Sequence, residues 1–182
     1  ATVSREERVM AKTIREIASS DLKHKEQVAA MTELARKDKG ALAELFDVLK
    51  TGNDVEKGTA AEVMKFVSQE APELMLPHLD VLIEYIDYRA PRVRWGCPES
   101  IGHIARKYPV EVEKAIPKLL ENLKDKSTVV RWCAAFALTE IAKHHRERGK
   151  ELATVLETLS ETEQNSGVRN LYVKALKEMA KA

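Results

Sequence analysis

Aromatic residues make up only 5% of this 182-residue chain, which contains seven glycines, six prolines and two cysteines. So few aromatic residues, with no stretch of alternating apolar and polar residues, argue against a β-sheet domain. The cysteines, Cys97 and Cys133, are too few for a disulfide framework or a zinc site, so we expect free thiols in a reducing compartment. No Gly/Ser-rich or Pro-rich stretch is long enough to be a linker, which predicts a single domain.

A strong charge of one sign and long apolar runs are missing as well. Thirty Lys and Arg residues stand against 29 Asp and Glu, a formal net charge of +1, which disfavours a polyanion as an obligatory partner. The charge is uneven: residues 51–89 hold three basic and eight acidic side chains, and residues 90–182 hold 17 and 12. No run approaches the ~20 apolar residues of a membrane span, and the first residues lack a signal peptide's apolar core. We therefore expect a cytoplasmic protein without a membrane partner.

What the chain does contain is an internal repeat. Val93-Arg94-Trp95 and Val130-Arg131-Trp132 lie 37 residues apart, and each opens an apolar pattern with helical spacing. A repeat of this length predicts stacked helix pairs, because one pair cannot cover its own apolar face. We therefore predict an all-α, right-handed solenoid of about five helix pairs, one domain with units near 1–37, 38–70, 71–108, 109–146 and 147–182.

Each unit divides into a first helix, a short polar turn and a second helix. The turns carry Asn, Asp, Ser, Gly or Pro, which cap helices and permit tight turns. Residues 143–150 are interpreted as a basic helix end and loop, for which a structural role and anion binding both stay open. The first helices are predicted at residues 4–18, 39–50, 72–88, 110–124 and 150–161.

These residues resemble the HEAT repeats and their bacterial HEAT-like relatives. The fourth unit carries the pattern most fully, with Pro117 in the first helix, Asp125 in the turn and Arg131 in the second helix. In that family the turn aspartate and the second-helix arginine form a ladder between neighbouring repeats, and the proline kinks the first helix. The resemblance implies these roles here and adds Arg94 and Arg169 to the ladder.

The other units depart from the family pattern in places. The second unit has Glu56 where the arginine belongs, and the fifth has Glu163 in place of the turn aspartate. The third unit has three more residues between its proline and its arginine than the fourth, which an extra helical turn at residues 86–88 would absorb. The resemblance is specific for the fold and says little about function.

Side chains for catalysis are nearly absent. The chain has no Gly-rich phosphate loop, no histidine pair at metal-ligand spacing and no Gly-flanked serine nucleophile. The neighbours His144 and His145 would point about 100° apart on a helix, so they cannot share one face. We therefore expect no catalytic residue, no metal and no cofactor.

The candidate binding residues lie on the second helices. Trp95 and Trp132 each follow the repeat arginine, so their side chains lean away from the inward valine stripe. Because second helices line the concave surface of HEAT-like arrays, the resemblance implies that the two tryptophans lie side by side there. Packing between repeats is the other role that fits them. The predicted concave-face binding set is Arg94, Trp95, Glu99, Arg106, Arg131, Trp132 and Lys143.

The repeat pattern breaks at Gly96-Cys97-Pro98. A proline inside a helix removes a backbone hydrogen bond and costs ~3 kcal/mol. Either the second helix of this unit starts late, with Pro98 in its first turn, or a kink frees the Arg94 carbonyl. The break is interpreted either as a register adjustment for the insertion upstream or as a functional irregularity.

Two functions are weighed. The first is a non-enzymatic scaffold that binds an acidic or amphipathic protein segment through the concave face. The second is a DNA-binding protein, or a repair enzyme like the HEAT-like alkylpurine DNA glycosylases, which place a catalytic aspartate four residues after a tryptophan. Here that position holds Glu99 after Trp95 and Phe136 after Trp132. A third hypothesis, a bilin-lyase-like protein, has no identifiable pigment site. We predict a protein or peptide partner and rank nucleic acid below it.

Overall fold

The computed structural model describes residues 12–182, which contain helices and no strand. The prediction of an all-α solenoid is confirmed. The first-helix layer consists of α2 (Ile14–Ala18), α4 (Lys39–Thr51), the 3-10 helix η1 (Pro72–His78) with α6 (Leu79–Glu84), the 3-10 helix η2 (Glu113–Ala115) with α8 (Ile116–Asn122), and α10 (Arg146–Thr162). The second-helix layer consists of α3 (His24–Lys37), α5 (Asp54–Glu70), α7 (Pro91–Ala105), α9 (Thr128–His144) and α11 (Ser166–Lys181). Of the predicted first helix at residues 4–18, the part before residue 12 lies outside the described residues.

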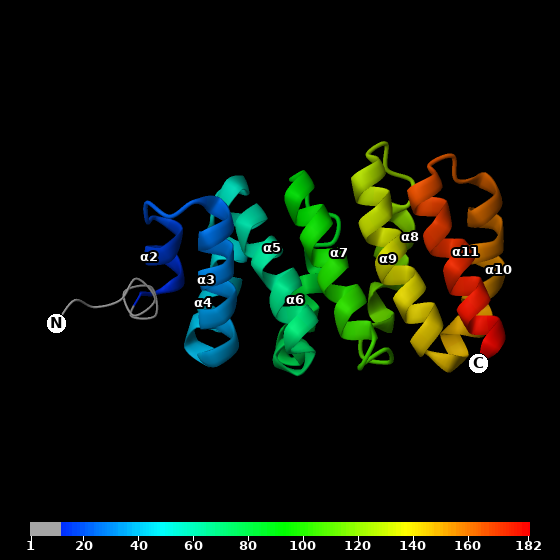
Figure 1. Cartoon of the computed structure of the whole chain (residues 1–182), viewed down its shortest axis with the longest axis horizontal. Coiled ribbons are helices and arrows are strands. Elements are labelled where there is room, and N and C mark those ends of the chain that lie inside the picture. The colour runs from blue at the N-terminus through cyan, green and yellow to red at the C-terminus, as the bar shows by residue number, and fades with distance from the viewer. Residues whose placement is uncertain (1–11) are drawn as a thin grey trace.

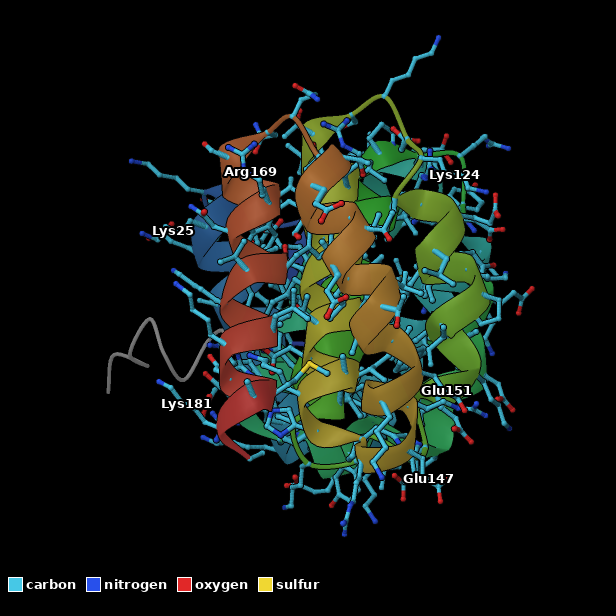
Figure 2. All side chains as sticks on the ribbon, turned by 90° about the vertical axis from the view of Figure 1, so that its right-hand side faces the viewer. Lys25, Lys124, Glu147, Glu151, Arg169 and Lys181 are labelled. Atoms are coloured by element: carbon cyan, nitrogen blue, oxygen red, sulfur yellow. The ribbon has the colours of Figure 1, made fainter. Side chains whose placement is uncertain are left out.

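The second helices stand side by side in chain order along the long axis (Figure 1). The end-on view separates the two layers, with Lys25 of α3 and Lys181 of α11 on one side and Glu151 of α10 on the other (Figure 2). We call the surface of α3, α5, α7, α9 and α11 that is turned away from the first-helix layer the second-helix face. Along this face, each helix presents repeat-equivalent positions next to those of its neighbours.

Short polar side chains fix where several helices begin. Asn53 and Glu56 form a reciprocal capping box at the start of α5, at 2.9 and 3.0 Å. Ser127 and Asn165 accept from backbone N–H groups in the first turns of α9 and α11. Each cap satisfies a donor that the helix itself leaves open, so the turns define the ends of the second helices.

Proline divides two of the first helices. Pro77 lies inside η1, directly before α6, and Pro117 lies in the first turn of α8, directly after η2. Because proline lacks an N–H, a shorter 3-10 segment meets an α-helix at each place. The insertion in the third unit is taken up by hydrogen-bonded turns after α6, with the buried Ile86 N–H donating to the Ile83 carbonyl at 3.3 Å.

Close approach of the second helices depends on glycine. A Cβ on Gly96 of α7 would lie 2.6 Å from the backbone of Ala61 in α5, and one on Gly102 would lie 2.5 Å from the ring of Phe136 in α9. No side chain fits at either distance. The two glycines therefore allow α5, α7 and α9 to pack tightly behind the second-helix face.

Two sequence interpretations of helix ends are corrected. The α7 helix begins at Pro91 and runs through Pro98, so it does not start late; Pro91 occupies a first-turn position where its missing N–H costs nothing. The predicted loop after α9 is a single residue, because α10 starts at Arg146 rather than Lys150. His145 makes this possible by capping α10, with its Nδ1 accepting from the Arg148 N–H at 3.2 Å.

Candidate binding surface

The Arg94 guanidinium leaves the second-helix face and reaches the turn before α9. Its Nη1 lies 2.7 Å from Asp125 Oδ2, and its Nη2 donates to Asn122 Oδ1 at 3.3 Å. The buried Asn122 amide donates in turn to the Ile86 carbonyl at 2.9 Å, and Asp125 accepts from the Ser127 N–H at 2.8 Å. The Arg94 and Asp125 side chains are 24% and 20% exposed, so water only partly screens their attraction.

Arg131 makes the equivalent connection one unit later. Its Nε and Nη2 both donate to the Glu163 carboxylate at 3.1 Å, and its Nη1 donates to the carbonyls of Asp125 and Lys126 at 3.0 and 3.1 Å. Arg169 donates to the Glu163 carbonyl at 3.2 Å. Burial would raise the pKa of Glu163, but the hydrogen bonds from Arg131 and the Asn165 backbone lower it below its usual value. Arg94 and Arg131 thus connect neighbouring units at the turn end of the array, whereas Arg169 binds the turn of its own unit.

The second unit uses lysine at this position. Glu56, which the sequence interpretation placed here, belongs instead to the capping box with Asn53. Lys57 is buried and its Nζ donates to the carbonyls of Leu49 and Lys50 at 2.8 and 2.9 Å, at the end of α4. A shift of 37 residues back from Arg94 leads to Lys57, so strict use of the repeat period would have identified it.

We expect Asp125→Ala to lower the free energy of unfolding by ~1–3 kcal/mol, because Arg94 loses its carboxylate partner in a half-buried place. Denaturant titration measures this. The control is Glu121→Ala, which breaks an exposed pair with Lys124 (70% and 72% exposed) and should cost under ~0.5 kcal/mol. Equal, small losses in both variants would contradict a stabilising role for the turn aspartate.

Trp95 lines a hollow between α5 and α7. The hollow has a volume of ≈ 180 Å³ and is bounded by Gly58 and Gly96, with Val129 of α9 at its edge. The indole Nε1 is buried, so the part of the Trp95 side chain that faces the hollow is carbon. Gly58 stands at the position equivalent to Trp95 in α5, and its lack of a side chain leaves room for the Arg92 side chain beside the hollow.

Trp132 forms an aromatic platform with its helix neighbour Phe136. The two rings stack at 5.6 Å between centroids with only 2° between their planes, and Trp132 is 36% exposed. Phe136 is buried beneath it, against the His103 ring at 5.1 Å and the Arg106 guanidinium at 5.6 Å. Burial and the nearby Arg106 charge lower the pKa of His103 to about 4, so this ring is neutral at pH 7. Trp132 therefore offers a rigid and partly uncovered ring face.

The predicted binding cations are already paired. Arg106 Nε lies 3.0 Å from Glu140 Oε2, and Lys143 Nζ lies 2.7 Å from Glu140 Oε1 and 3.4 Å from Glu178. Burial would raise the pKa of Glu140, but its hydrogen bonds to Lys143 and Arg106 lower it, so the carboxylate stays ionised. Arg94 and Arg131 lie in the connections at the turn end rather than beside the tryptophans. The structure thus divides the predicted binding set into aromatic residues and cations that already have carboxylate partners within the protein.

Glu99 faces the Trp95 hollow and accepts a hydrogen bond from the Cys133 thiol at 3.4 Å. Burial and the Glu99 charge raise the pKa of Cys133 well above its usual value, and burial raises that of Cys97 to about 12. Both thiols are therefore protonated and poor nucleophiles at pH 7.

A polar network that the sequence interpretation missed crosses three second helices. Glu62 of α5 lies 2.9 Å from His24 Nε2 of α3 and 3.0 Å from Arg92 Nη2 of α7. Arg92 also donates to Thr59 at 3.3 Å, so its side chain lies across Gly58. Glu62 and Arg92 lie only 30 residues apart, which is not the repeat spacing, so nothing in the repeat pattern indicated that these side chains would meet.

Within residues 12–182, no group of three His, Cys, Asp or Glu side chains is arranged to hold a metal ion. Among the same residues, no helix has the length and apolar character needed to cross a membrane.

The family comparison matches the HEAT repeat model to residues 115–145, which hold α8 and α9 with their turn. Residues 115–145 form a HEAT repeat. This HEAT repeat contains Trp132 and Phe136, together with Asp125 and Arg131. No curated protein matches the chain.

Solved structures extend the likeness from this HEAT repeat to the whole array. An engineered protein covers 93% of this chain and is itself covered to 80%, with 23% identity and a TM-score of 0.74. A computationally designed armadillo repeat protein for modular peptide recognition covers 91%, is covered to 80%, and has 20% identity and a TM-score of 0.70. A designed armadillo repeat protein in complex with the peptide (KR)4 covers 98%, is covered to 77%, and has 22% identity and a TM-score of 0.69. At these identities the likeness concerns the fold.

Proposed function

We propose that this protein is a non-enzymatic scaffold that binds a segment of another protein on the second-helix face of α7 and α9. The observation that carries the proposal is the Trp132–Phe136 platform, because a partly exposed indole held parallel to a second ring is a pre-ordered aromatic anchor, and tryptophan is enriched among the residues that dominate binding. Two structural neighbours, one designed for modular peptide recognition and one in complex with the peptide (KR)4, support a peptide-sized ligand.

Apolar contact dominates this recognition. The cations that would attract an acidic segment, Arg106 and Lys143, already share Glu140, and Arg92 already contacts Glu62. An acidic ligand would have to compete with these carboxylates for the same donors. The aromatic surface has no such competitor, so the amphipathic ligand of the sequence hypothesis is favoured over the acidic one.

Selection of binding sequences from a random peptide library tests the proposal. Selected peptides should bind the native protein and lose ~10-fold or more of their affinity for Trp132→Ala, since aromatic anchors dominate such interfaces. The matched control is Val155→Ala, because Val155 of α10 is as exposed as Trp132 (37% against 36%) but lies in the first-helix layer. Peptides that tolerate Trp132→Ala and respond to Val155→Ala would place binding elsewhere.

The DNA-binding alternative gives a different result in a fluorescence anisotropy titration with duplex DNA. We expect weak binding without dependence on Trp95 or Trp132, because Arg92, Arg106 and Lys143 are ion-paired within the protein. No release of an alkylated base is expected, and Glu99→Gln should change nothing. Tight binding that falls steeply as salt rises, with base release that requires Glu99, would overturn the scaffold proposal.

A further inference from the structure

We infer that the segment bound at α7 and α9 is a proline-rich chain in the polyproline II conformation, with residues three apart contacting Trp95 and Trp132. The inference rests on the proposed function and specifies its ligand. It follows from the spacing of the two aromatic sites, the hydrogen-bonding groups of the face and its charge.

The spacing comes from the repeat. Trp95 and Trp132 occupy equivalent positions on neighbouring helices, so their sites are separated by one helix–helix distance. Packed helices lie ~8–10 Å apart, and Gly102 at the contact with α9 allows a value in this range without strain. One turn of polyproline II advances three residues at ~3.1 Å each, or ~9 Å, and returns the side chain to the same face. Residues i and i+3 of such a chain therefore meet both sites.

The hydrogen-bonding groups of α7 and α9 disfavour a ligand that binds as a β-strand. A strand gains affinity from backbone hydrogen bonds with its receptor. The α7 and α9 helices contain no Asn or Gln, and their backbone groups are largely used within the helices. A polyproline II chain keeps its backbone solvated and needs no such partners. It also loses little conformational freedom on binding.

The chemistry of the two sites fits proline rings. The Trp95 hollow, at ≈ 180 Å³, accommodates a small ring, and the surface that Trp95 presents to it is carbon. The Trp132 platform presents a flat aromatic face. The charged side chains around the hollow, Glu62 and Arg92 of one ion pair with Lys65 and Glu99, balance to zero, which suits an uncharged ligand.

Fluorescence anisotropy with three labelled peptides tests the inference. Decaproline is the probe, a Gly-Ser peptide of equal length is the flexible control, and an amphipathic Ala-Leu-Lys helix is the competing class. Decaproline should bind better than the Gly-Ser peptide, and Trp95→Ala and Trp132→Ala should each weaken it by ~10-fold or more. Val155→Ala should leave its affinity unchanged. Trp132→Phe, which retains a ring over Phe136, should weaken it less than Trp132→Ala, and circular dichroism melts verify that each variant is folded.

The outcomes separate this inference from the proposed function. The inference is overturned if decaproline does not bind, or if its affinity is the same for the native protein, Trp95→Ala and Trp132→Ala. If the helical peptide binds in a Trp132-dependent manner while decaproline does not, the ligand is helical and the scaffold proposal stands. If library selection also yields no Trp132-dependent peptide, the scaffold proposal fails as well.

Discussion

Deletion of residues 147–182 should lower the melting temperature by ~10 °C or more. The deletion removes α11 and all but the first residue of α10, and with them the buried side chains Leu156, Val168 and Tyr172. It also uncovers the apolar surface of α9 that includes Leu138 and Ile141. Solenoid stability is approximately a sum of unit and interface terms, so loss of one interface of ~5 kcal/mol shifts the midpoint by this amount.

Circular dichroism melts of the full and shortened chains measure the effect. Removal of only Lys181 and Ala182, which are exposed, is the control and should leave the midpoint unchanged. A shortened chain that melts at the temperature of the full chain would show that the fifth helix pair is an independent appendage.

Gly96→Ala should destabilise the protein by ~1–3 kcal/mol, although alanine is the better helix former by ~1 kcal/mol. The added methyl carbon would lie 2.6 Å from the Ala61 backbone, and a backbone cannot move aside as a flexible side chain can. The α5 and α7 helices would have to separate, which also alters the Trp95 hollow between them.

Denaturant unfolding of Gly96→Ala and Gly167→Ala compares the two cases. Gly167 is exposed near the start of α11, and its added carbon would meet only the Asn165 side-chain oxygen at 3.2 Å. We expect Gly167→Ala to change stability by less than ~0.5 kcal/mol. A stabilising effect of Gly96→Ala would contradict the close approach of the helices.

The fold could be predicted because the repeat has a physical cause. Each helix pair must bury the same apolar stripe against its neighbour, so Val93 and Val130 recur with a fixed period, and the short polar turns between them supply caps. The start of α10 was missed because its cap is His145, a residue outside the usual Ser, Thr, Asp and Asn set.

The binding surface could be predicted only in part. Sequence spacing assigned Trp95 and Trp132 to the second helices, but it did not show that the first lines a hollow and the second stacks on Phe136. Arginine is long enough to leave its own helix face, so Arg94 and Arg131 could be located only from the turns that they reach. Side-chain reach across units is a three-dimensional property that a helical wheel does not contain.

The pairing of charges on the second-helix face has a kinetic consequence. Arg92 with Glu62, and Arg106 and Lys143 with Glu140 and Glu178, bring opposite charges within 3.4 Å of each other, so the fields of these groups largely cancel a short distance from the surface. These paired groups add little attraction at long range and do not steer a partner, and association without steering proceeds at ~10⁵–10⁶ M⁻¹s⁻¹. Such a protein recognises its partner after collision, and the lifetime of the complex, rather than the speed of capture, distinguishes one partner from another.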